Sequence, residues 1–361
     1  MTNFRMGPRK KKTSKKRLFL RVFLILIVLM VASTGAYAYW LTKKAEEAAN
    51  NAYDKDNTRI KSELRETQVE PMTDNVSILF IGIDDSEKRE QGSNHSRSDA
   101  LLLATLNNKT KSVKLLSIPR DSYAYIPYVG YQDKITHAHA FGGTNATIDT
   151  VENMLNVPVD YYYRLNFDAF IEIVDALDGV QADVPYALHE LDENDKRTVN
   201  LKPGLQTLNG REALALARTR KQDSDIKRGE RQQMILEAIL KKASSVTSFT
   251  KYDDLLAAVG NNMKTNMTFN EMKSFFEYIK GGMPNVESLA LKGDDDMSTG
   301  IYYYKLNETE LVNTQNTLRK QLGLTDSDPS NAQDSTADTN SSGGSGGSGY
   351  KSNYNSDNKS Q

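Results

Sequence analysis

Residues 217–232 combine cationic and acidic side chains at spacings that suit the binding of an anion. The stretch holds four arginines and two aspartates and ends in a glutamine: Arg218, Arg220, Asp223, Asp225, Arg228, Arg231 and Gln232. The planar guanidinium group donates paired hydrogen bonds that match a phosphate, and match a carboxylate equally well. The stretch therefore indicates either a site for a phosphate-rich ligand or an internal network of ion pairs with Asp223, Asp225 and Glu230.

Two helices are predicted to present this cluster. Asn209 can cap the first helix, and Glu212 three residues later completes a capping box. In the second helix, Arg228, Arg231 and Gln232 share a face that continues into the apolar residues 235, 238 and 239. Cations at a helix N-terminus oppose the helix dipole, so this inward placement is favourable when an anion lies between them.

Further polar residues stand at the ends of strand-like runs. Asp84 follows the run 76–83, Arg97 and Asp99 precede the run 100–106, and Arg120 follows the run 113–118 together with Asp121. In open α/β sheets, ligands bind beyond the carboxyl ends of the strands. Because Mg²⁺ takes one or two carboxylates, waters and substrate phosphate oxygens, Asp84 and Asp99 are predicted metal ligands. For Asp84, Asp85 and Asp121 the alternative is a turn or capping role.

Several other kinds of site are not supported. His137 and His139 have no third histidine or cysteine ligand nearby for zinc, and the chain has no cysteine at all, which excludes disulfides and thiol nucleophiles. Ser98 and Ser117 lack a G-x-S-x-G context. The tyrosine triplets at 161–163 and 302–304 are predicted to be half-buried strands, with sugar stacking as the minority alternative.

The order of the periodic segments predicts one α/β domain with a mixed central sheet flanked by helices. Strands are predicted at 76–83, 100–106, 113–118, 180–184 and 287–291. Helices are predicted at 146–155, 167–177, 228–242, 252–259, 269–279 and 308–322.

The N-terminus predicts a membrane anchor in front of this domain. Nine lysines and arginines lie within residues 1–21, and the uncharged run 22–42 would be about 31 Å long as a helix, enough to span a bilayer. The positive-inside rule then places residues 1–21 in the cytoplasm and the rest of the chain outside the cell, as a single-pass protein of the cell membrane. The alternative is a signal peptide cleaved at the A-x-A-like site 36–38.

Beyond the predicted anchor we expect a stalk at 43–74, a catalytic domain at 75–324 and a Ser-, Gly- and Asp-rich disordered tail at 325–361. Because 9 of the 46 Lys and Arg residues precede residue 22, 37 remain against 47 Asp and Glu, an acidic excess of 10. An acidic domain outside the cytoplasm argues against a nucleic-acid partner.

Seven stretches, in consistent order, resemble motifs of the LytR-CpsA-Psr family. They are I-G-I-D-D at 81–85, R-S-D-A-L-L-L-A-T-L-N at 97–107, L-S-I-P-R-D-S at 116–122, D-K-I-T-H-A-H-A-F-G-G at 133–143, V-D-Y-Y-Y-R-L-N-F-D-A-F at 159–170, L-N-G-R-E-A-L-A-L-A-R-T-R at 208–220 and D-I-K-R-G-E-R-Q-Q at 225–233. One departure is Asp178, where the family usually has glycine, and it is expected to alter a turn.

The resemblance implies an α-β-α catalytic domain and a function. Members are membrane-anchored phosphotransferases of Gram-positive envelopes, of EC 2.7.8 type. They move anionic glycopolymers such as teichoic acid or capsule from a polyprenyl-pyrophosphate carrier onto peptidoglycan, and they release polyprenyl phosphate. The expected partners here are therefore the lipid-linked glycopolymer, peptidoglycan and membrane lipid, and the expected cofactor is Mg²⁺, or Mn²⁺ in its place.

The resemblance also assigns residues to roles. It places Asp84 and Asp99 on the metal, and it places seven polar residues on the pyrophosphate: Arg97, Arg120, Arg218, Arg220, Arg228, Arg231 and Gln232. As catalytic residues we predict Arg97, Arg120, Arg220 and Asp225, because phosphoryl transfer depends mainly on positioning and on neutralising charge in the transition state. For Asp225 and Asp121, accepting the hydroxyl proton and orienting an arginine remain alternatives. Phe167 to Leu177 is a candidate wall for the lipid.

Two other functions remain open at this point. Water in place of the sugar hydroxyl would make the same site a polyprenyl-pyrophosphate hydrolase. Binding without chemistry would make the protein a non-catalytic envelope polysaccharide-binding or regulatory protein. Analysis of the products separates the three.

Overall fold

The computed structural model describes residues 15–55, 57, 59, 61–84, 96–193, 196–219, 224–243, 263–280 and 284–324. The chain divides into two units, 1–324 and 325–361, and every described residue lies in the first. The predicted tail at 325–361 and the predicted helix at 252–259 lie outside the described residues.

A six-stranded mixed sheet forms the centre of the first unit, in the order β11-β6-β1-β2-β3-β12. The strands are β1 (Val76–Ile83), β2 (Ser98–Asn107), β3 (Ser112–Ser117), β6 (Tyr161–Leu165), β11 (Met263–Thr265) and β12 (Asn285–Ala290). β1 pairs with β2 antiparallel and with β6 parallel, and β3 pairs with β12 parallel. The α/β class with a mixed central sheet is confirmed.

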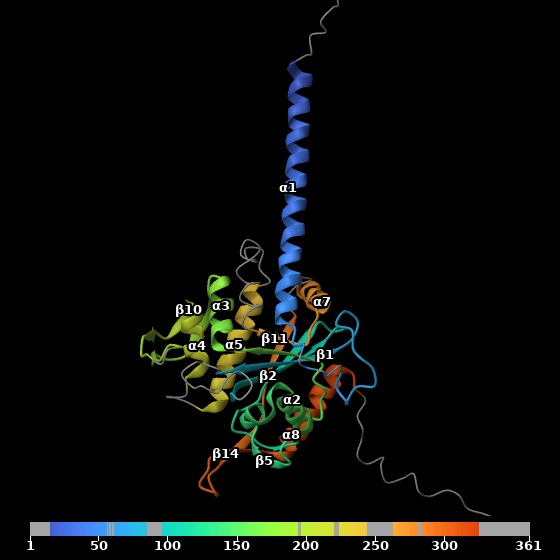
Figure 1. Ribbon diagram of the computed structural model, residues 1–361. Coiled ribbons are helices and arrows are strands. Elements are labelled where there is room, and N and C mark those ends of the chain that lie inside the picture. Colours follow the sequence, from blue (N-terminus) through green and yellow to red (C-terminus); the bar gives the residue numbers. More distant parts are fainter. Residues whose placement is uncertain are drawn as a thin grey trace, which may run out of the picture. The chain divides into compact units, whose positions relative to one another are not determined.

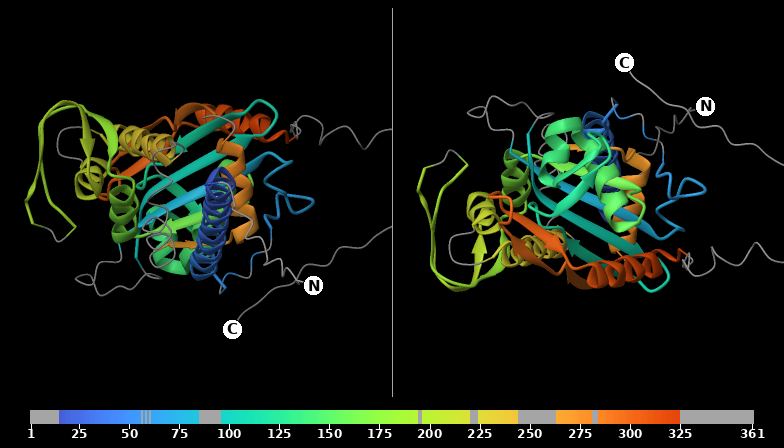
Figure 2. Two further views of the ribbon diagram at one scale, coloured as in Figure 1. Left: turned by 90° about the horizontal axis from the view of Figure 1, so that it is seen from above. Right: turned by 90° about the horizontal axis from the view of Figure 1, so that it is seen from below.

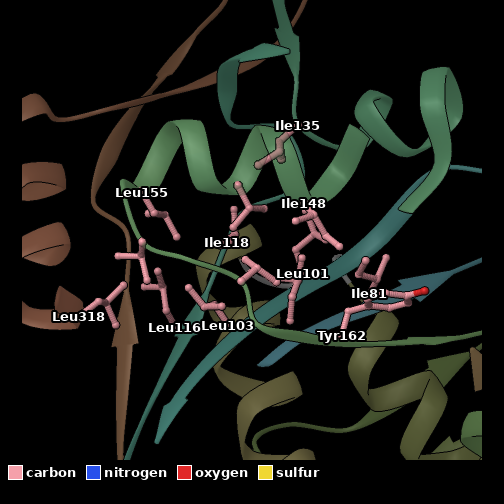
Figure 3. Packing of buried hydrophobic residues seen from close by; sticks show 14 of the residues in the cluster. Ile81, Leu101, Leu103, Leu116, Ile118, Ile135, Ile148, Leu155, Tyr162 and Leu318 are labelled. Carbon is pink, nitrogen blue, oxygen red and sulfur yellow. The ribbon is translucent and has the colours of Figure 1, made fainter. Parts of the chain in front are cut away.

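Helices cover the two faces of this sheet (Figures 1 and 2). On one face lie α2 (Thr136–Leu155) and α8 (Glu308–Leu322), and Figure 3 shows Ile148 and Leu155 packed on Leu101, Leu103 and Leu116. On the other face lie α3 (Phe167–Ala176), α5 (Asp225–Ala243) and α7 (Phe269–Lys280). Alternate residues of a strand point to opposite faces, so β1 and β2 supply apolar side chains to both layers.

A second apolar cluster lies beside the sheet and supports α3, α5 and α4 (Gly210–Arg218). It includes the pair β7 (Val180–Val184) and β10 (Gly204–Leu208), and the pair β8 (Leu188–Glu190) and β9 (Val199–Leu201). Before β7, Asp178 has a φ of 59°, a left-handed conformation that glycine adopts without strain. Asp178 thus takes the conformation that glycine would adopt here, and an altered turn stays a prediction.

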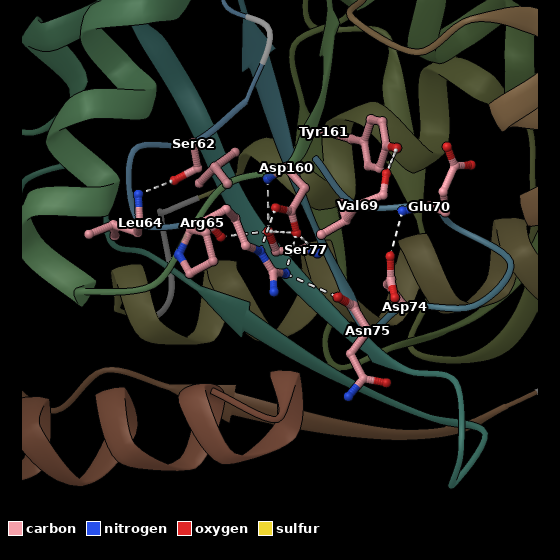
Figure 4. Close-up of polar contacts among 12 residues, drawn as sticks. Ser62, Leu64, Arg65, Val69, Glu70, Asp74, Asn75, Ser77, Asp160 and Tyr161 are labelled. Carbon is pink, nitrogen blue, oxygen red and sulfur yellow. Dashed lines mark hydrogen bonds and ion pairs between the residues drawn. The ribbon is translucent and has the colours of Figure 1, made fainter. Parts of the chain in front are cut away.

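The segment expected as a stalk is packed against the domain. α1 (Lys15–Ala52) ends with Ala49 and Ala52 buried, and the next residues pair with β11 through Tyr53 and Thr265. Farther on, Arg65 forms a two-point ion pair with Asp160, at 2.9 Å and 2.7 Å, and donates 3.0 Å to the Asn75 carbonyl (Figure 4). Residues 43–74 are thus helical as far as Ala52 and then held by specific contacts.

The span predicted at residues 22–42 lies within α1. Among the residues that the structure describes, no helix contains an apolar stretch long enough to cross a membrane. Several side chains of the predicted span lie outside the described part of the chain, so the span stays a prediction.

Two short additional elements complete the architecture near the site. β4 (Tyr123–Ile126) and β5 (Tyr131–Lys134) form a hairpin between β3 and α2, and β13 (Gly293–Asp296) pairs with β14 (Tyr303–Leu306). The triplet 161–163 lies in a strand as predicted, but Tyr161 and Tyr162 are fully buried rather than half-buried, because β6 is an interior strand.

Candidate active site

A cavity of about 760 Å³ lies between the sheet and the layer formed by α3, α5 and α7. The sheet lines the cavity with the face that points away from α2, through residues that include Ile78 and Phe80 of β1 and Leu102 of β2. The helices contribute apolar residues from α3, α5 and α7: Phe170, Ile173, Ile235, Leu236, Ile239, Leu240, Met272 and Phe275. The α3 segment singled out as a candidate lipid wall therefore lines the cavity.

The polar lining of this cavity comes mainly from six residues, all predicted site residues: Arg97, Asp99, Arg120, Arg218, Arg228 and Gln232. They come from β2, the end of β3, the end of α4 and the first half of α5, so four separate segments converge. An apolar cavity with a few convergent charged groups is the usual form of a site for an amphipathic ligand.

Two of these cations are held by contacts inside the site. Arg120 forms an ion pair with Asp99, and its Nε lies 3.6 Å from Asp121 Oδ2. The Arg218 guanidinium lies over the Phe167 ring, 4.3 Å from its centroid. A cation–π contact of this kind fixes the guanidinium plane while leaving its N–H donors available.

Arg228 is buried and pairs with Asp225, the first residue of α5. Its two terminal nitrogens lie 3.1 Å and 3.2 Å from the two Asp225 oxygens. Asp225 therefore orients an arginine, one of the two roles left open for it, and it also offsets the positive end of the helix dipole. Glu230 pairs instead with Lys227, at 2.8 Å, on the exposed side of α5.

Arg231 and Gln232 hold the C-terminal end of α4. Arg231 donates to the carbonyls of Leu216, at 3.0 Å, and Thr219, at 2.6 Å, while Gln232 donates 3.3 Å to Ala217. The last carbonyls of a helix have no partner within the helix, so side-chain donors of this kind fix its end. Gln232 also lines the cavity, whereas Arg231 is buried outside its lining.

The predicted metal ligands lie at one end of the β1–β2 pair. The register joins Ile83 to Ser98 with an irregularity after Gly82, so Asp84 and Asp99 both adjoin that pair. Asp84 is buried and Asp99 is half-buried. Within the described ranges, no group of three or more acidic or histidine side chains could by itself hold a metal ion.

Some predicted residues cannot be placed, because Arg220, Asp85 and Asp223 lie outside the described residues. His137 and His139, considered for zinc, lie in α2 and contact Asp133 and the Ser96 carbonyl, both through Nδ1.

Three further residues that support the site carry no signal of that role in the sequence. Phe167 was considered only as a lipid wall, and nothing marked it as the partner of Arg218. Thr219, whose carbonyl receives Arg231, donates 2.6 Å to the buried Glu190 of β8. Lys134 of β5 lies 3.0 Å from Asp121. No local spacing signals any of these contacts, because each partner comes from a distant segment.

The sequence and the fold both resemble those of known proteins. Residues 37–320 match the model of the LytR_cpsA_psr family. The chain is 39% identical over 323 residues to the polyisoprenyl-teichoic acid–peptidoglycan teichoic acid transferase TagT of Bacillus subtilis strain 168, covering 88% of this chain and 99% of that protein.

Two solved structures are similar to this one. A structure of TagT bound to LI-WTA has a TM-score of 0.64 and 40% identity, over 73% of this chain and 97% of that chain. A structure of the LytR-CPS2A-psr family protein YwtF (TagT) with bound octaprenyl pyrophosphate lipid has a TM-score of 0.61 and 37% identity, with the same two coverages of 73% and 97%.

Proposed function

The chain belongs to the LytR-CpsA-Psr family, and on that premise we propose that it transfers an anionic glycopolymer from a polyprenyl-pyrophosphate carrier to peptidoglycan and releases polyprenyl phosphate. The observation that carries this proposal is the pairing of an apolar cavity of about 760 Å³ with a cluster of arginines in its lining. The apolar part suits a prenyl chain, and the arginines suit the pyrophosphate.

In the proposed reaction a hydroxyl of the acceptor sugar attacks the phosphorus that carries the glycopolymer. An O–P bond forms to the acceptor, the P–O bond to the lipid-side phosphate breaks, and polyprenyl phosphate leaves. Arg218, Arg120 and Arg97 would neutralise the charge that grows on the phosphate oxygens, which is the main need of phosphoryl transfer. The Phe167 ring would keep Arg218 in position before the donor binds.

We propose Asp84 and Asp99 as ligands of a Mg²⁺ ion, or of Mn²⁺ in its place. Both residues adjoin the same strand pair, and two carboxylates with substrate oxygens and water are a donor set that suits Mg²⁺. When bound, the ion would supply additional positive charge to the pyrophosphate. Arg120, which pairs with the Asp99 carboxylate and lines the cavity, would add its own positive charge beside such an ion.

We also propose that residues 22–42 anchor the chain in the membrane of a Gram-positive cell, with residues 1–21 in the cytoplasm. The uncharged run and the nine cations before it support this orientation. The catalytic domain would then meet its lipid-linked donor at the outer surface of that membrane.

The proposal is tested with the full chain in detergent, Mg²⁺, a polyprenyl-pyrophosphate-linked saccharide and peptidoglycan oligomers. Both polyprenyl phosphate release and covalent attachment of the sugar are followed. We expect Arg218→Ala to lower kcat/KM by about 100-fold or more. Arg211→Ala, which removes an exposed arginine from the same helix, should leave it within about twofold of the wild-type value. Release of polyprenyl phosphate without attachment of the sugar would identify a hydrolase. If neither product formed, that result would contradict an enzymatic function.

A further inference from the structure

A group of tyrosines lies on the surface next to Asp121, outside the cavity. Tyr123 and Tyr125 of β4 share one face of the β4–β5 hairpin with Lys134, which pairs with Tyr123 across the strands. Tyr302 and Tyr303 lie beside them at the start of β14. We call these five residues the tyrosine face. The site described above uses none of its rings.

Specific contacts hold the tyrosine face to the catalytic cluster. The Tyr304 backbone N–H donates 2.9 Å to the Asp121 carbonyl, which ties β14 to the segment that carries Arg120. The Lys134 ammonium lies 3.0 Å from Asp121 and 5.7 Å from the centroids of both the Tyr302 and Tyr303 rings. A single lysine therefore connects the aromatic rings to the carboxylate beside Arg120.

The rings are held in orientation, and Tyr123, Tyr302 and Tyr303 are half-buried. Tyr302 donates its hydroxyl to Asp295 at 2.8 Å, and the ring of Tyr303 meets that of Tyr123 edge to face at 4.8 Å. Tyr125 is 43% exposed. The opposite face of the same hairpin buries Ala124 and Ile126, so the hairpin presents its aromatic side to solvent because its apolar side packs on the domain.

Acidic groups affect the Tyr302 hydroxyl. Burial is the largest cause that raises the pKa of the Tyr302 hydroxyl, followed by its hydrogen bond to Asp295, and the negative charges of Asp225 and Asp121 raise it further. The tyrosine face is thus within electrostatic reach of the carboxylate that orients Arg228.

We infer that the tyrosine face binds the sugar chain of the acceptor, peptidoglycan, and brings its hydroxyl to the arginine cluster. This inference rests on the proposed function, which requires three binding regions. The apolar cavity accounts for the lipid and the arginines for the pyrophosphate, so the acceptor sugar needs a third region. Flat aromatic rings with polar groups at their edges suit the alternating C–H and hydroxyl surface of a pyranose.

The position of the tyrosine face agrees with this partner. In Figure 1, β5 and β14 lie at the end of the first unit away from α1. If residues 22–42 are the membrane anchor, the elements that carry the tyrosine face lie at the end of the first unit away from the bilayer. The donor lipid and the acceptor would then approach the arginine cluster from different sides.

The kinetic test uses the full chain in detergent and varies acceptor and donor separately. Tyr125→Ala and Tyr302→Ala should each raise the KM for peptidoglycan oligomers about 3- to 10-fold, from the worth of one aromatic contact. The KM for the lipid-linked donor should stay within about twofold. Tyr125→Phe and Tyr302→Phe, which keep the ring, should restore the acceptor KM. An unchanged acceptor KM, or a rise in the donor KM instead, would overturn the inference.

Tyr131→Ala is the matched control. Tyr131 belongs to the same hairpin and is 51% exposed, but it lies on the opposite side of β5 from Lys134, against Phe141. Its removal should leave the acceptor KM unchanged. A comparable rise in this variant would mean that loss of any tyrosine weakens the hairpin, and would contradict a specific role for the tyrosine face.

A binding assay separates this inference from the proposed function. The full chain is sedimented with insoluble peptidoglycan in the absence of donor. We expect the wild type and the Tyr131→Ala variant to pellet, and the Tyr125→Ala/Tyr302→Ala variant to stay in solution. If the wild type pellets through these tyrosines but transfers no glycopolymer, the proposed function fails and the binding surface stands. If the double variant also pelleted, the result would refute the binding of peptidoglycan by the tyrosine face.

Discussion

Replacing Gly229 by alanine should displace the helix that carries two of the polar cavity residues. Gly229 lies in α5, and a Cβ added to it would stand 2.2 Å from Ser117 Oγ and 2.9 Å from Ser117 Cβ of β3. The hydroxyl can rotate away, but the Cβ of Ser117 is fixed to the strand, so α5 and β3 must separate. Arg228 and Gln232 would move with the helix.

The size of the effect follows from two opposing terms. Overpacking of this kind lowers the free energy of unfolding by about 2–3 kcal/mol. Alanine in place of glycine inside a helix raises it by about 1 kcal/mol. We therefore expect Gly229→Ala to lower the free energy of unfolding by about 1–2 kcal/mol, or the Tm by about 2–8 °C. Ser117→Gly alone should cost about 1 kcal/mol because glycine weakens a strand.

The double variant decides whether the close approach is the cause. Ser117→Gly removes both atoms that the new Cβ would meet, so Gly229→Ala/Ser117→Gly should regain a Tm within about 2 °C of the wild type. The assay is thermal unfolding of the full chain in detergent, with the initial rate of donor turnover measured on the same samples. Turnover should fall in the Gly229→Ala variant and recover in the double variant. Losses that simply add would refute the reasoning.

Three further changes test other parts of the site and its support. Arg65→Ala leaves the buried Asp160 carboxylate without its cation and should lower the free energy of unfolding by about 3 kcal/mol. The measurement is thermal unfolding. A Tm within about 2 °C of the wild type, which corresponds to about 1 kcal/mol or less, would contradict the role of this pair. Phe167→Leu keeps an apolar wall but removes the ring that lies against Arg218. Loss of this cation–π contact, about 1 kcal/mol, should raise the donor KM about fivefold. An unchanged donor KM would show that the ring does not position Arg218 for the donor. Asn209→Ala removes the capping box of α4 and should cost about 1 kcal/mol, visible as faster amide hydrogen exchange in the first turn of that helix but not in α8.

The parts of the fold that follow local rules could be predicted from the sequence. β1, β7 and α8 have the bounds that alternation and helical periodicity predicted, and the capping box at Asn209 and Glu212 is present with both hydrogen bonds. These features depend on the spacing of residues within four positions of one another, so they can be predicted from the sequence alone.

The packing of residues 53–75 could not be predicted in the same way. Their composition, polar with few large apolar residues, is typical of a loose linker. What holds them is a set of contacts with residues far along the chain, such as Arg59 with Asp149 and Arg65 with Asp160. A single sequence gives no distance between such residues. These ion pairs are therefore visible only once β6 and α2 are in place.

The cavity illustrates a second limit. β2 is apolar on both faces, which predicts burial on both sides. Leu101 and Leu103 meet tightly packed residues of α2, whereas Leu102 and Ala104 line a space that no side chain fills. Nothing in the residue types distinguishes a face that meets a helix closely from one that meets it across a cavity, because both need apolar side chains.

The arginine cluster shows how helical geometry divides residues that the sequence presents together. Arg228 and Gln232 are four residues apart and so lie nearly in line on α5, and both line the cavity. Arg231 is rotated to one flank of that line by the 3.6-residue period, which turns its guanidinium toward the end of α4. Of the predicted ion-pair network, the described residues contain the Arg228–Asp225 pair, whereas Glu230 pairs with Lys227 and the phosphate site stays a prediction. The buried donors that fix the end of α4, together with the Phe167 ring, hold Arg218 at the cavity.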